Sequence, residues 1–546
     1  MSESDPLLVL AGAFPPVERG QWMAKVASVL LKGHDEAGPE ALAKAFDSRL
    51  VHHTYDGIAI GPLYTADDAP APGADGVARV VGTGAWDVRQ RVDVTGDGTD
   101  AAGAVLTELE RGATSILLGL REAALIDADL LDRVLAGSLL DIAPIALDAG
   151  ERVVDAARGL MAVWDRRGLD PTTVSGTFGA DPIGESARGS QADLDAALAD
   201  AAELGRSGAG KHPGVRALVV DATVYHDAGA SDAQELGCSL ATAVAYLRSL
   251  LGAGLDPDAA CSQLEFRYAV TAEQFPTIAK LRAARRLWSR AAQVAGASHP
   301  ARAQRQHAVT SSVMMSRYDP WVNLLRTTLG SFAAGVGGAD SLTVVPFDAL
   351  TVPGGSERAR RLARNTAAVL TDESHLARVV DPAGGSWFVE HLTDALAQAG
   401  WAWFTEIERA GGMVAALEQG LVNERLAATW DTKRGDLAAR RQRLTGISEF
   451  PDITEDAPAP LVASASAGSG LPRVRAARVF EDLRDRAGGA EAVVFLATLG
   501  PPAVHTARAA FARNLFDAGG IRAVTAPPDE DLPSAFKASG ARLACV

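Results

Sequence analysis

Apolar and polar positions follow two alternating patterns along most of this chain, and the stretch 318–348 shows both most clearly. After Asp319 and Pro320, apolar residues recur at helical spacing as far as Gly337. Aspartate followed by proline is typical of a helix start, so Asp319 is the expected N-cap and the helix is expected to bury its apolar face. The residues expected on that face are Trp321, Leu324, Leu325, Thr328, Phe332 and Val336. The apolar run 341–347 predicts a buried strand directly after the helix.

The same step of strand and helix repeats from Trp86 onward, at roughly 30 to 40 residues per unit. The predicted strands are 85–94, 115–120, 144–148, 173–178, 215–222, 262–270, 304–310 and 341–347. Helical stretches such as 151–167, 232–251 and 272–295 separate them. Eight strands alternating with helices favour an α/β fold of the (β/α)8 TIM-barrel type. An open doubly wound sheet stays possible at this point, because the number of strands alone does not prove closure.

The segments outside the predicted barrel divide the rest of the chain. We expect an N-terminal arm at 1–50, the barrel at 51–380, a helical extension at 381–446, a linker at 447–474 and a second α/β domain at 475–546. The arm holds one predicted helix, 17–31, whose apolar residues Trp22, Met23, Val26 and Leu30 lie on one side. Such an arm is expected to pack on another surface. The linker is rich in Pro, Ala, Ser and Gly.

The second α/β domain contains three predicted strands and two predicted helices. The strands are 491–499, 521–525 and 542–546, and the helices are 503–518 and 529–539. A doubly wound domain normally has five or more strands, so three would leave a sheet edge bare. We therefore expect that this is a partial domain, and we favour a sequence that stops before the domain is complete.

Composition and charge narrow the class of protein. The chain has 52 basic and 68 acidic residues, a net charge of −16, which argues against nucleic acid or an anionic membrane as the main partner. An anionic substrate would need local basic residues, and the run 278–290 could attract phosphates; its other interpretation is a helix with a solvated charged face. Three scattered cysteines and no apolar run of about 20 residues predict a cytoplasmic protein.

Candidate chemistry is sparse at the predicted C-terminal strand ends, where barrel enzymes hold their catalytic groups. His226 and Asp227 follow the fifth strand and could act as a general acid–base pair. The alternative is a capping aspartate beside a surface histidine. The sequence contains no HExxH, paired CxxC or P-loop motif, so we expect no dedicated metal or nucleotide-phosphate site.

The stretches 318–348 and 359–390 closely resemble the methylmalonyl-coenzyme A mutase family, and the resemblance extends over most of the chain. It implies a TIM barrel followed by a flavodoxin-like, cobalamin-binding type of domain. The resemblance implies a role in propionate metabolism, because family enzymes hold adenosylcobalamin between these two domains and rearrange an acyl-coenzyme A by radicals. Such chemistry needs a closed, dry pocket and a few fixed polar groups, because the cofactor supplies the reactivity.

The chain departs from the family's catalytic pattern in the barrel. The family's tyrosine before the first-strand tryptophan is Val81 here, and the glutamine of the fourth-strand Gly-Thr-Ile-Gln is Gly179. The family's histidine after the fifth strand aligns with Val224, so that His226 lies two residues late. The resemblance therefore implies no catalytic residues on this chain, with His226 and Asp227 as the remaining candidates.

The family's cobalamin signature, Asp-x-His-x-x-Gly, is also lost. Its three defining positions hold Pro502, Val504 and Ala507. His505 is one residue out of register, and one residue turns a side chain by about 100° around a helix. We therefore expect no cofactor on this chain.

One set of the family's polar residues is retained in this chain. Arg305, His307 and Thr310 match its seventh-strand Arg-x-His-x-x-Thr, part of the thioester-binding wall, so a remnant of an acyl-coenzyme A groove is expected. Loss of the reaction groups with retention of the scaffold resembles the small, non-catalytic subunit of the bacterial heterodimers. The expected partner is a homologous catalytic large subunit that carries adenosylcobalamin. Two alternatives stay open: an active acyl-coenzyme A mutase with displaced histidines, and an unrelated barrel enzyme that uses His226 and Asp227.

Overall fold

The structure is a computed structural model. It describes residues 15, 17–32, 38–68, 85–456, 458–459, 470–487, 492–526 and 531–546. The chain divides into two compact units, Met1–Asp67 and Asp68–Val546. In the part of the chain that the structure describes, no helix is both long enough and apolar enough to cross a membrane.

The first unit is a small helical hairpin with a short β-hairpin. Its elements are α1 (Arg19–Leu30), α2 (Pro39–Leu50), β1 (His52–His53) and β2 (Ala59–Ile60). The predicted helix at 17–31 is thus confirmed. Trp22 of α1 meets Phe46 of α2 edge to face, with 6.2 Å between ring centroids. None of the described side chains of this unit is fully buried, so the apolar side of α1 is only partly covered within the unit.

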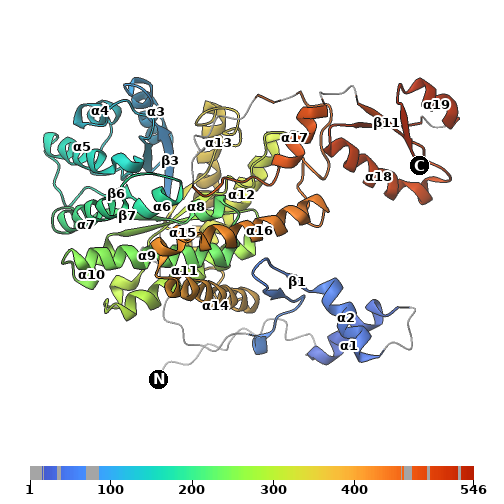
Figure 1. Ribbon diagram of the computed structural model, residues 1–546, viewed down its shortest axis with the longest axis horizontal. Helices are drawn as coiled ribbons and strands as arrows, with labels where there is room; N and C mark the ends of the chain where they lie inside the picture. Colours follow the sequence, from blue (N-terminus) through green and yellow to red (C-terminus); the bar gives the residue numbers. More distant parts are fainter. Residues whose placement is uncertain are drawn as a thin grey trace. The chain divides into compact units, whose positions relative to one another are not determined.

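The second unit is built around a closed barrel of eight parallel strands (Figure 1). The strands are β3 (Asp87–Asp93), β4 (Ser115–Gly119), β5 (Ile145–Asp148), β6 (Gly176–Ala180), β7 (Val215–Asp221), β8 (Leu264–Val270), β9 (Gln306–Thr310) and β10 (Ser341–Thr343). Each predicted strand is present, and β10 pairs with both β3 and β9. This pairing closes the barrel, so the open-sheet alternative is wrong.

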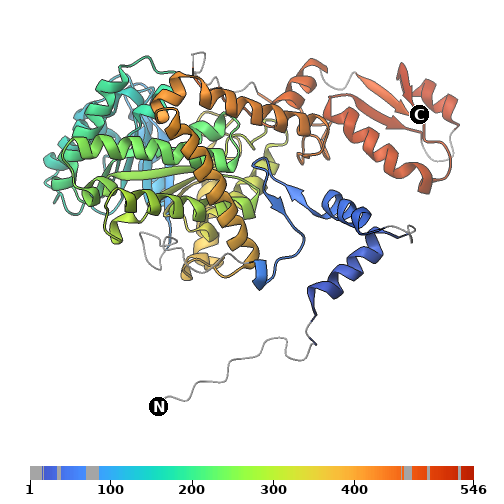
Figure 2. The same cartoon turned by 60° about the horizontal axis from the view of Figure 1, so that its bottom comes forward.

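Helices connect the strands and surround the barrel, as the repeating pattern predicts. They are α3 (Thr99–Glu110), α4 (Ala128–Val134), α5 (Val153–Arg166), α6 (Pro182–Ala187), α7 (Leu194–Lys211), α8 (Thr223–Asp227), α9 (Asp232–Gly252), α10 (Pro257–Ser262), α11 (Gln274–Val294), α12 (Pro320–Gly337) and α13 (Glu357–Ala368). Three more follow, namely α14 (Trp387–Arg409), α15 (Met413–Glu418) and α16 (Leu421–Ala438). The first of these lies against α9 and α11 (Figure 2).

Helix α11 corrects the interpretation of the basic run 278–290. Lys280, Arg282 and Arg285 are buried rather than solvated. Arg282 pairs with Asp381 and Glu390, and Arg285 donates to the backbone carbonyl of Gly337 and to other buried groups. These cations are occupied by the protein itself, so both the phosphate interpretation and the solvated-face interpretation are wrong for them.

Helix α12 corrects a second expectation. Asp319 stands at the N-cap position and Pro320 begins the helix, as the sequence predicts, but Asp319 has a left-handed backbone (φ 45°) and its side chain makes no capping hydrogen bond. The face turned toward the barrel carries small and polar residues. An added Cβ at Gly335 would lie 2.7 Å from the ring of Trp86, and one at Gly337 would lie 2.9 Å from Leu281. Only small residues fit this close approach, and Trp321 and Leu325 therefore face outward.

After the barrel the chain crosses back over it. Residues 470–477, which we call the strap, lead into α17 (Arg478–Ala487). A separate three-stranded parallel sheet follows, in the order β12–β11–β13. Its elements are β11 (Val493–Leu496), α18 (Pro502–Ala518), β12 (Arg522–Thr525), α19 (Leu532–Ala538) and β13 (Leu543–Cys545) (Figure 1). These three strands and two helices match the predicted ones.

Candidate functional site

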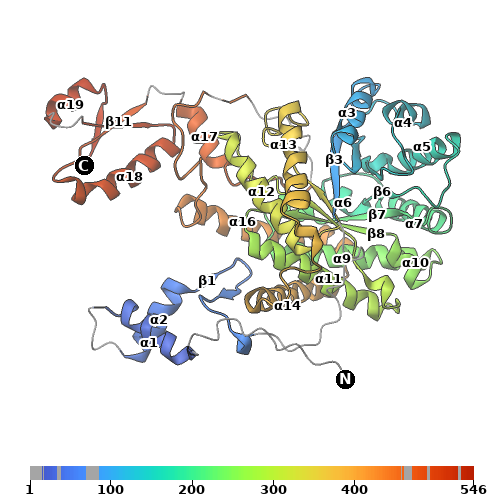
Figure 3. The same cartoon turned by 180° about the vertical axis from the view of Figure 1, so that it is seen from behind.

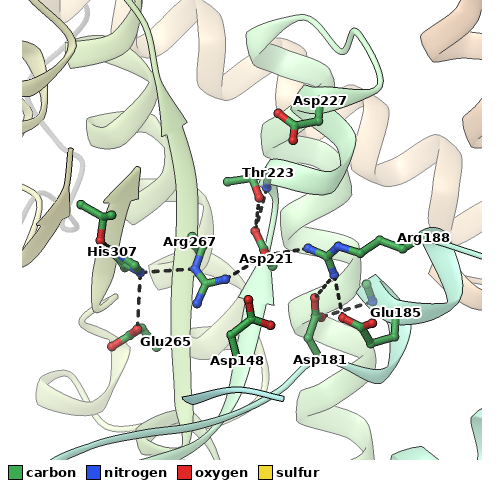
Figure 4. Close-up of polar contacts among 12 residues, drawn as sticks. Asp148, Asp181, Glu185, Arg188, Asp221, Thr223, Asp227, Glu265, Arg267 and His307 are labelled. Carbon is green, nitrogen blue, oxygen red and sulfur yellow. Dashed lines mark hydrogen bonds and ion pairs between the residues drawn. The ribbon is translucent and has the colours of Figure 1, made fainter. Parts of the chain in front are cut away.

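Charged side chains gather where the barrel strands end, at the C-terminal mouth. Arg188 binds three carboxylates of this group (Figure 4). Its guanidinium donates to Asp221 at 2.7 Å, to Glu185 at 3.0 Å and to Asp181 at 3.4 Å. Asp221 also accepts from Arg267 at 2.9 Å. One arginine, directly after α6, is thus tied to the C-terminal ends of β6 and β7.

The ion pairs continue around the mouth on the other side. Arg121 binds Glu185 with both nitrogens of its fork, at 2.5 and 2.8 Å, and its Nε donates to Asp148 at 2.7 Å. Arg91 donates to the second oxygen of Asp148, also at 2.7 Å. The same arginine pairs with Asp93 on its own strand. The mouth therefore alternates in charge from β3 to β7.

The network also extends inward along the barrel axis. Arg267 donates from Nε to Nδ1 of His307 at 3.3 Å, and His307 Nε2 lies 2.8 Å from the hydroxyl of Thr343 on β10. Deeper still, Arg89 pairs with Glu265 at 2.6 Å. Each of the eight strands, or one of the two residues after it, contributes a polar group to this network. The polar groups that a ligand would bind are already paired with one another.

The pKa values of these groups follow from burial and pairing. Burial disfavours the charged form of Asp148, yet Arg91 and Arg121 outweigh it and lower the pKa of this carboxyl. Burial, with Arg89 and Arg267 nearby, lowers the pKa of His307, which is therefore neutral. Asp181 differs from Asp148: burial raises its pKa to about 7, against the opposing charge of Arg188.

His226 lies on α8 and does not pair with Asp227. Its Nε2 lies 2.6 Å from the hydroxyl of Ser311, and its Nδ1 lies 3.5 Å from Glu235. Serine, histidine and carboxylate in this order resemble a nucleophilic triad. However, Ser311 is 2% exposed, His226 is 8% exposed, and Glu235 is held at 2.6 Å by Lys280. The arrangement joins the loop after β9 to α8 and α9.

Asp227 points to other groups. It accepts a hydrogen bond from Ser312 at 2.9 Å and from Arg473 of the strap at 3.4 Å. The structure therefore does not bring His226 and Asp227 together as an acid–base pair. Figure 4 shows Asp227 apart from the ion pairs around Arg188.

The strap crosses the mouth just above these residues. Its backbone donates from Leu471 to the carbonyl of Ala187, from Val474 to that of Asp227 and from Ala476 to that of Val313. These three hydrogen bonds are 2.7, 2.7 and 3.0 Å long. At Gly470 an added Cβ would lie 2.2 Å from the backbone of Arg188, so the strap approaches too closely for any side chain there. The strap thus covers the side of the mouth between β6 and β9.

The three residues of the expected thioester wall are not assembled into one surface. Arg305 precedes β9, at the end of the barrel opposite the mouth, and lies 3.6 Å from Glu265. His307 is the second residue of the strand, is buried, and lies 4.0 Å from the same carboxylate. Thr310 ends the strand, and its hydroxyl accepts from the backbone of Val345 at 2.8 Å. Residues 307 and 310 are an odd number apart, which places their side chains on opposite faces of a strand.

The structure also shows what occupies the positions of the family's other reaction groups. Gly179 in β6 has φ 78°, and an added Cβ would lie 2.0 Å from the carbonyl oxygen of Leu147. This backbone cannot hold the side chain of a glutamine. Val224 is buried in α8. Val81 lies outside the residues that the structure describes.

The C-terminal positions do not fit a cobalamin ligand set. Pro502 begins α18 and Val504 is exposed on its first turn. His505 is half-buried on the same turn, and within the described residues its Nδ1 has no hydrogen-bond partner. A ligating histidine usually has its other nitrogen held by a carboxylate or carbonyl. Ala507 stands where the motif requires glycine.

The ion-pair network is absent from the sequence-based predictions, although the chain carries a signal for it. Arg89 and Arg91 lie two residues apart in one predicted strand, and Glu265 and Arg267 do so in another. Alternate positions point to the same side of a strand. Charged residues at this spacing in buried strands indicate a charged barrel interior.

Comparison with known proteins identifies the family. The family model described as "Methylmalonyl-CoA mutase" matches residues 118–503. A "Methylmalonyl-CoA mutase small subunit" from Streptomyces virginiae is 51% identical over 99% of this chain and 89% of that protein. A protein of the same name from Propionibacterium freudenreichii subsp. shermanii is 38% identical, over 98% and 85%. The "Methylmalonyl-CoA mutase" of Escherichia coli K12 is 35% identical over 42% of this chain and 33% of its own length. The chain belongs to the methylmalonyl-CoA mutase family.

Proposed function

We propose that this chain is the non-catalytic small subunit of a heterodimeric, adenosylcobalamin-dependent methylmalonyl-CoA mutase. Its partner is a homologous large subunit, which carries the cofactor and interconverts methylmalonyl-CoA and succinyl-CoA. The role of the present chain is to bind and stabilise that subunit. The names of the relatives that cover most of the chain support the pairing, because a small subunit implies a large one.

The observation that carries the proposal is the ion-pair network at the barrel mouth. An acyl-coenzyme A substrate would have to separate Arg188 or Arg267 from Asp221 before it could bind there. Breaking a buried ion pair by removing one partner costs about 3–5 kcal/mol. A substrate that offers only a few polar atoms in return gains too little to repay several such losses.

The cofactor positions support the same proposal. Pro502, Val504 and Ala507 offer neither a carboxylate nor an imidazole at the positions where the family's motif has them. His505 stands alone on the first turn of α18. We expect the purified chain to show no visible spectrum of imidazole-ligated cobalt when it is titrated with adenosylcobalamin. A His505→Ala variant should behave identically.

Reconstitution tests the proposal directly. The chain, the large subunit from the same host and an equimolar mixture are each assayed with methylmalonyl-CoA and adenosylcobalamin. We expect no turnover by this chain alone, and the highest and most lasting turnover by the mixture. Turnover by this chain alone that disappears in a His226→Ala variant would overturn the proposal.

That last result would support the second candidate, an enzyme that uses His226. The hydrogen bond from this histidine to Ser311 and its contact with Glu235 are the observations in its favour. The burial of Ser311 and the strap over the mouth argue against it, since a substrate would have to displace the strap first.

A further inference from the structure

Three large apolar side chains form an uncovered row on the outside of the barrel. Trp321, Leu325 and Leu329 of α12 are 48%, 64% and 42% exposed. They are spaced four residues apart, so they lie on one side of the helix and extend along it for about 12 Å. We call this row the α12 ridge. Figure 3 shows α12 on the outer side of the barrel, next to α13.

The same apolar stripe continues along α12, but there it is covered. Phe332 packs against a cluster that contains Val336, Ile278 and Val389, together with Leu376 from the segment after α13. The chain thus provides its own cover for the C-terminal half of the stripe. Within the described residues of the second unit, the N-terminal half has no such cover.

Two more exposed apolar residues follow in the chain. Val379 and Val380 come shortly after Leu376, which packs against the same cluster as Phe332, and both are about half exposed. Large exposed apolar patches are uncommon on a monomer and mark interaction sites.

The N-terminal end of the ridge is fixed in position. Trp321 stacks on Phe347 with 4.6 Å between ring centroids, and the guanidinium of Arg358 lies 4.9 Å above its ring. A tryptophan held on both sides loses little conformational entropy when it is buried by a partner. Arg358 and Arg361 are both exposed on α13 beside it. The surface that fits the ridge is thus an apolar groove with carboxylates at one end.

We propose that the α12 ridge docks into the catalytic large subunit; this inference rests on the function proposed above. A row of residues at i, i+4 and i+8 is how a helix anchors in an apolar groove, and tryptophan and arginine are the residue types enriched at binding hot spots. A lasting interface of this kind buries roughly 2,000 Å² or more in total. A ridge of three side chains is therefore an anchor within a larger contact area.

The test compares two single substitutions in the full-length chain. Leu325→Glu puts a charge in the middle of the ridge. Val294→Glu, at the end of α11, is the matched control, because Val294 is a 70% exposed apolar residue on a neighbouring barrel helix. The affinity of each variant for the purified large subunit is measured by calorimetry, and the thermal midpoint of each isolated variant is measured in parallel. We expect Leu325→Glu to weaken binding at least tenfold, with wild-type affinity for Val294→Glu and unchanged midpoints for both.

The outcomes separate this inference from the proposed function. If the wild-type chain binds the large subunit and Leu325→Glu binds equally well, the ridge is not part of the interface, and the proposed function stands. If the wild-type chain does not bind the large subunit at all, the proposed function itself is wrong. A large fall in the midpoint of the isolated Leu325→Glu variant would mean that this chain covers the ridge itself, and would overturn the inference.

Discussion

Helices α11 and α12 are neighbours on the same barrel, and they distribute their residues in opposite ways. Lys280, Arg282 and Arg285 of α11 are buried, whereas Trp321 and Leu325 of α12 are exposed. This difference in burial follows from the elements that pack around each helix. The first helix is enclosed by α9, α12 and α14, which supply carboxylates and carbonyls for its cations. The second approaches the barrel so closely at Gly335 and Gly337 that no larger residue fits there, and the remainder of its inner face carries mainly small or polar residues. Residue type alone therefore does not decide which side of a barrel helix is buried.

The largest expected effect comes from breaking the buried charge cluster of α11. Lys280 lies 2.6 Å from Glu235 and 2.9 Å from Asp232, and no part of its side chain is exposed. Burial opposes its charge, but these two carboxylates outweigh burial and raise its pKa. A Lys280→Met substitution leaves both carboxylates without their cation and should lower the free energy of unfolding by about 3–5 kcal/mol. Urea unfolding of the isolated chain measures this loss.

Arg290 provides the control on the same helix. It is exposed, and it bonds only its neighbour Gln293 in the described contacts. Arg290→Met should stay within about 0.5 kcal/mol of wild type. Equal losses for the two variants would show that burial of the charge is not what distinguishes them.

A second experiment concerns Asp181, a buried carboxyl for which the effect of burial outweighs the attraction of Arg188. The pKa of Asp181 in the folded chain, about 7, lies above its ordinary value of 3.8 because of burial and the nearby Asp221. Between these two values the folded chain holds a proton that the unfolded chain has released. The contribution of Asp181 to the free energy of unfolding therefore falls as the pH rises from about 4 to about 7, by at most about 1.4 kcal/mol per pH unit.

An Asp181→Asn substitution removes this contribution. As the pH is raised from 5 to 7, the unfolding free energy of the wild type should fall relative to that of the variant. Urea titrations at several pH values provide the measurement. Parallel pH curves for the two proteins would mean that Asp181 is ionised in the folded chain at all these pH values.

The smallest effect is expected on the exposed side of α12. Leu325→Ala should change the unfolding free energy of the isolated chain by less than about 0.5 kcal/mol, because its side chain is 64% exposed and little contact is lost. The comparison with α11 would fail if this variant lost as much stability as Lys280→Met. Such a loss would mean that Leu325 is covered in the folded chain.

The sequence predicts the barrel well because its evidence is local. Each strand is a short apolar run, each helix has its own period, and both can be read within about 20 residues. The pairing of charges cannot be predicted in this way. Lys280 pairs with Glu235, which is 45 residues away in the sequence, and Arg89 pairs with Glu265, which is 176 residues away. The outward face of α12 was missed for the same reason, since the tight contact of Gly335 with Trp86 depends on an element far away in sequence.

The strap has a consequence for the order in which this protein is completed during synthesis. The last barrel strand ends at Thr343 and the strap begins at residue 470, so 470 − 343 = 127 residues separate them. At roughly 5–20 residues per second, the ribosome needs roughly 6 to 25 s to add that length. A barrel that closes promptly would stand open to water during this interval. Its arginines and carboxylates can form their ion pairs before the strap is made, and the strap then adds its backbone hydrogen bonds beside a network that is already formed.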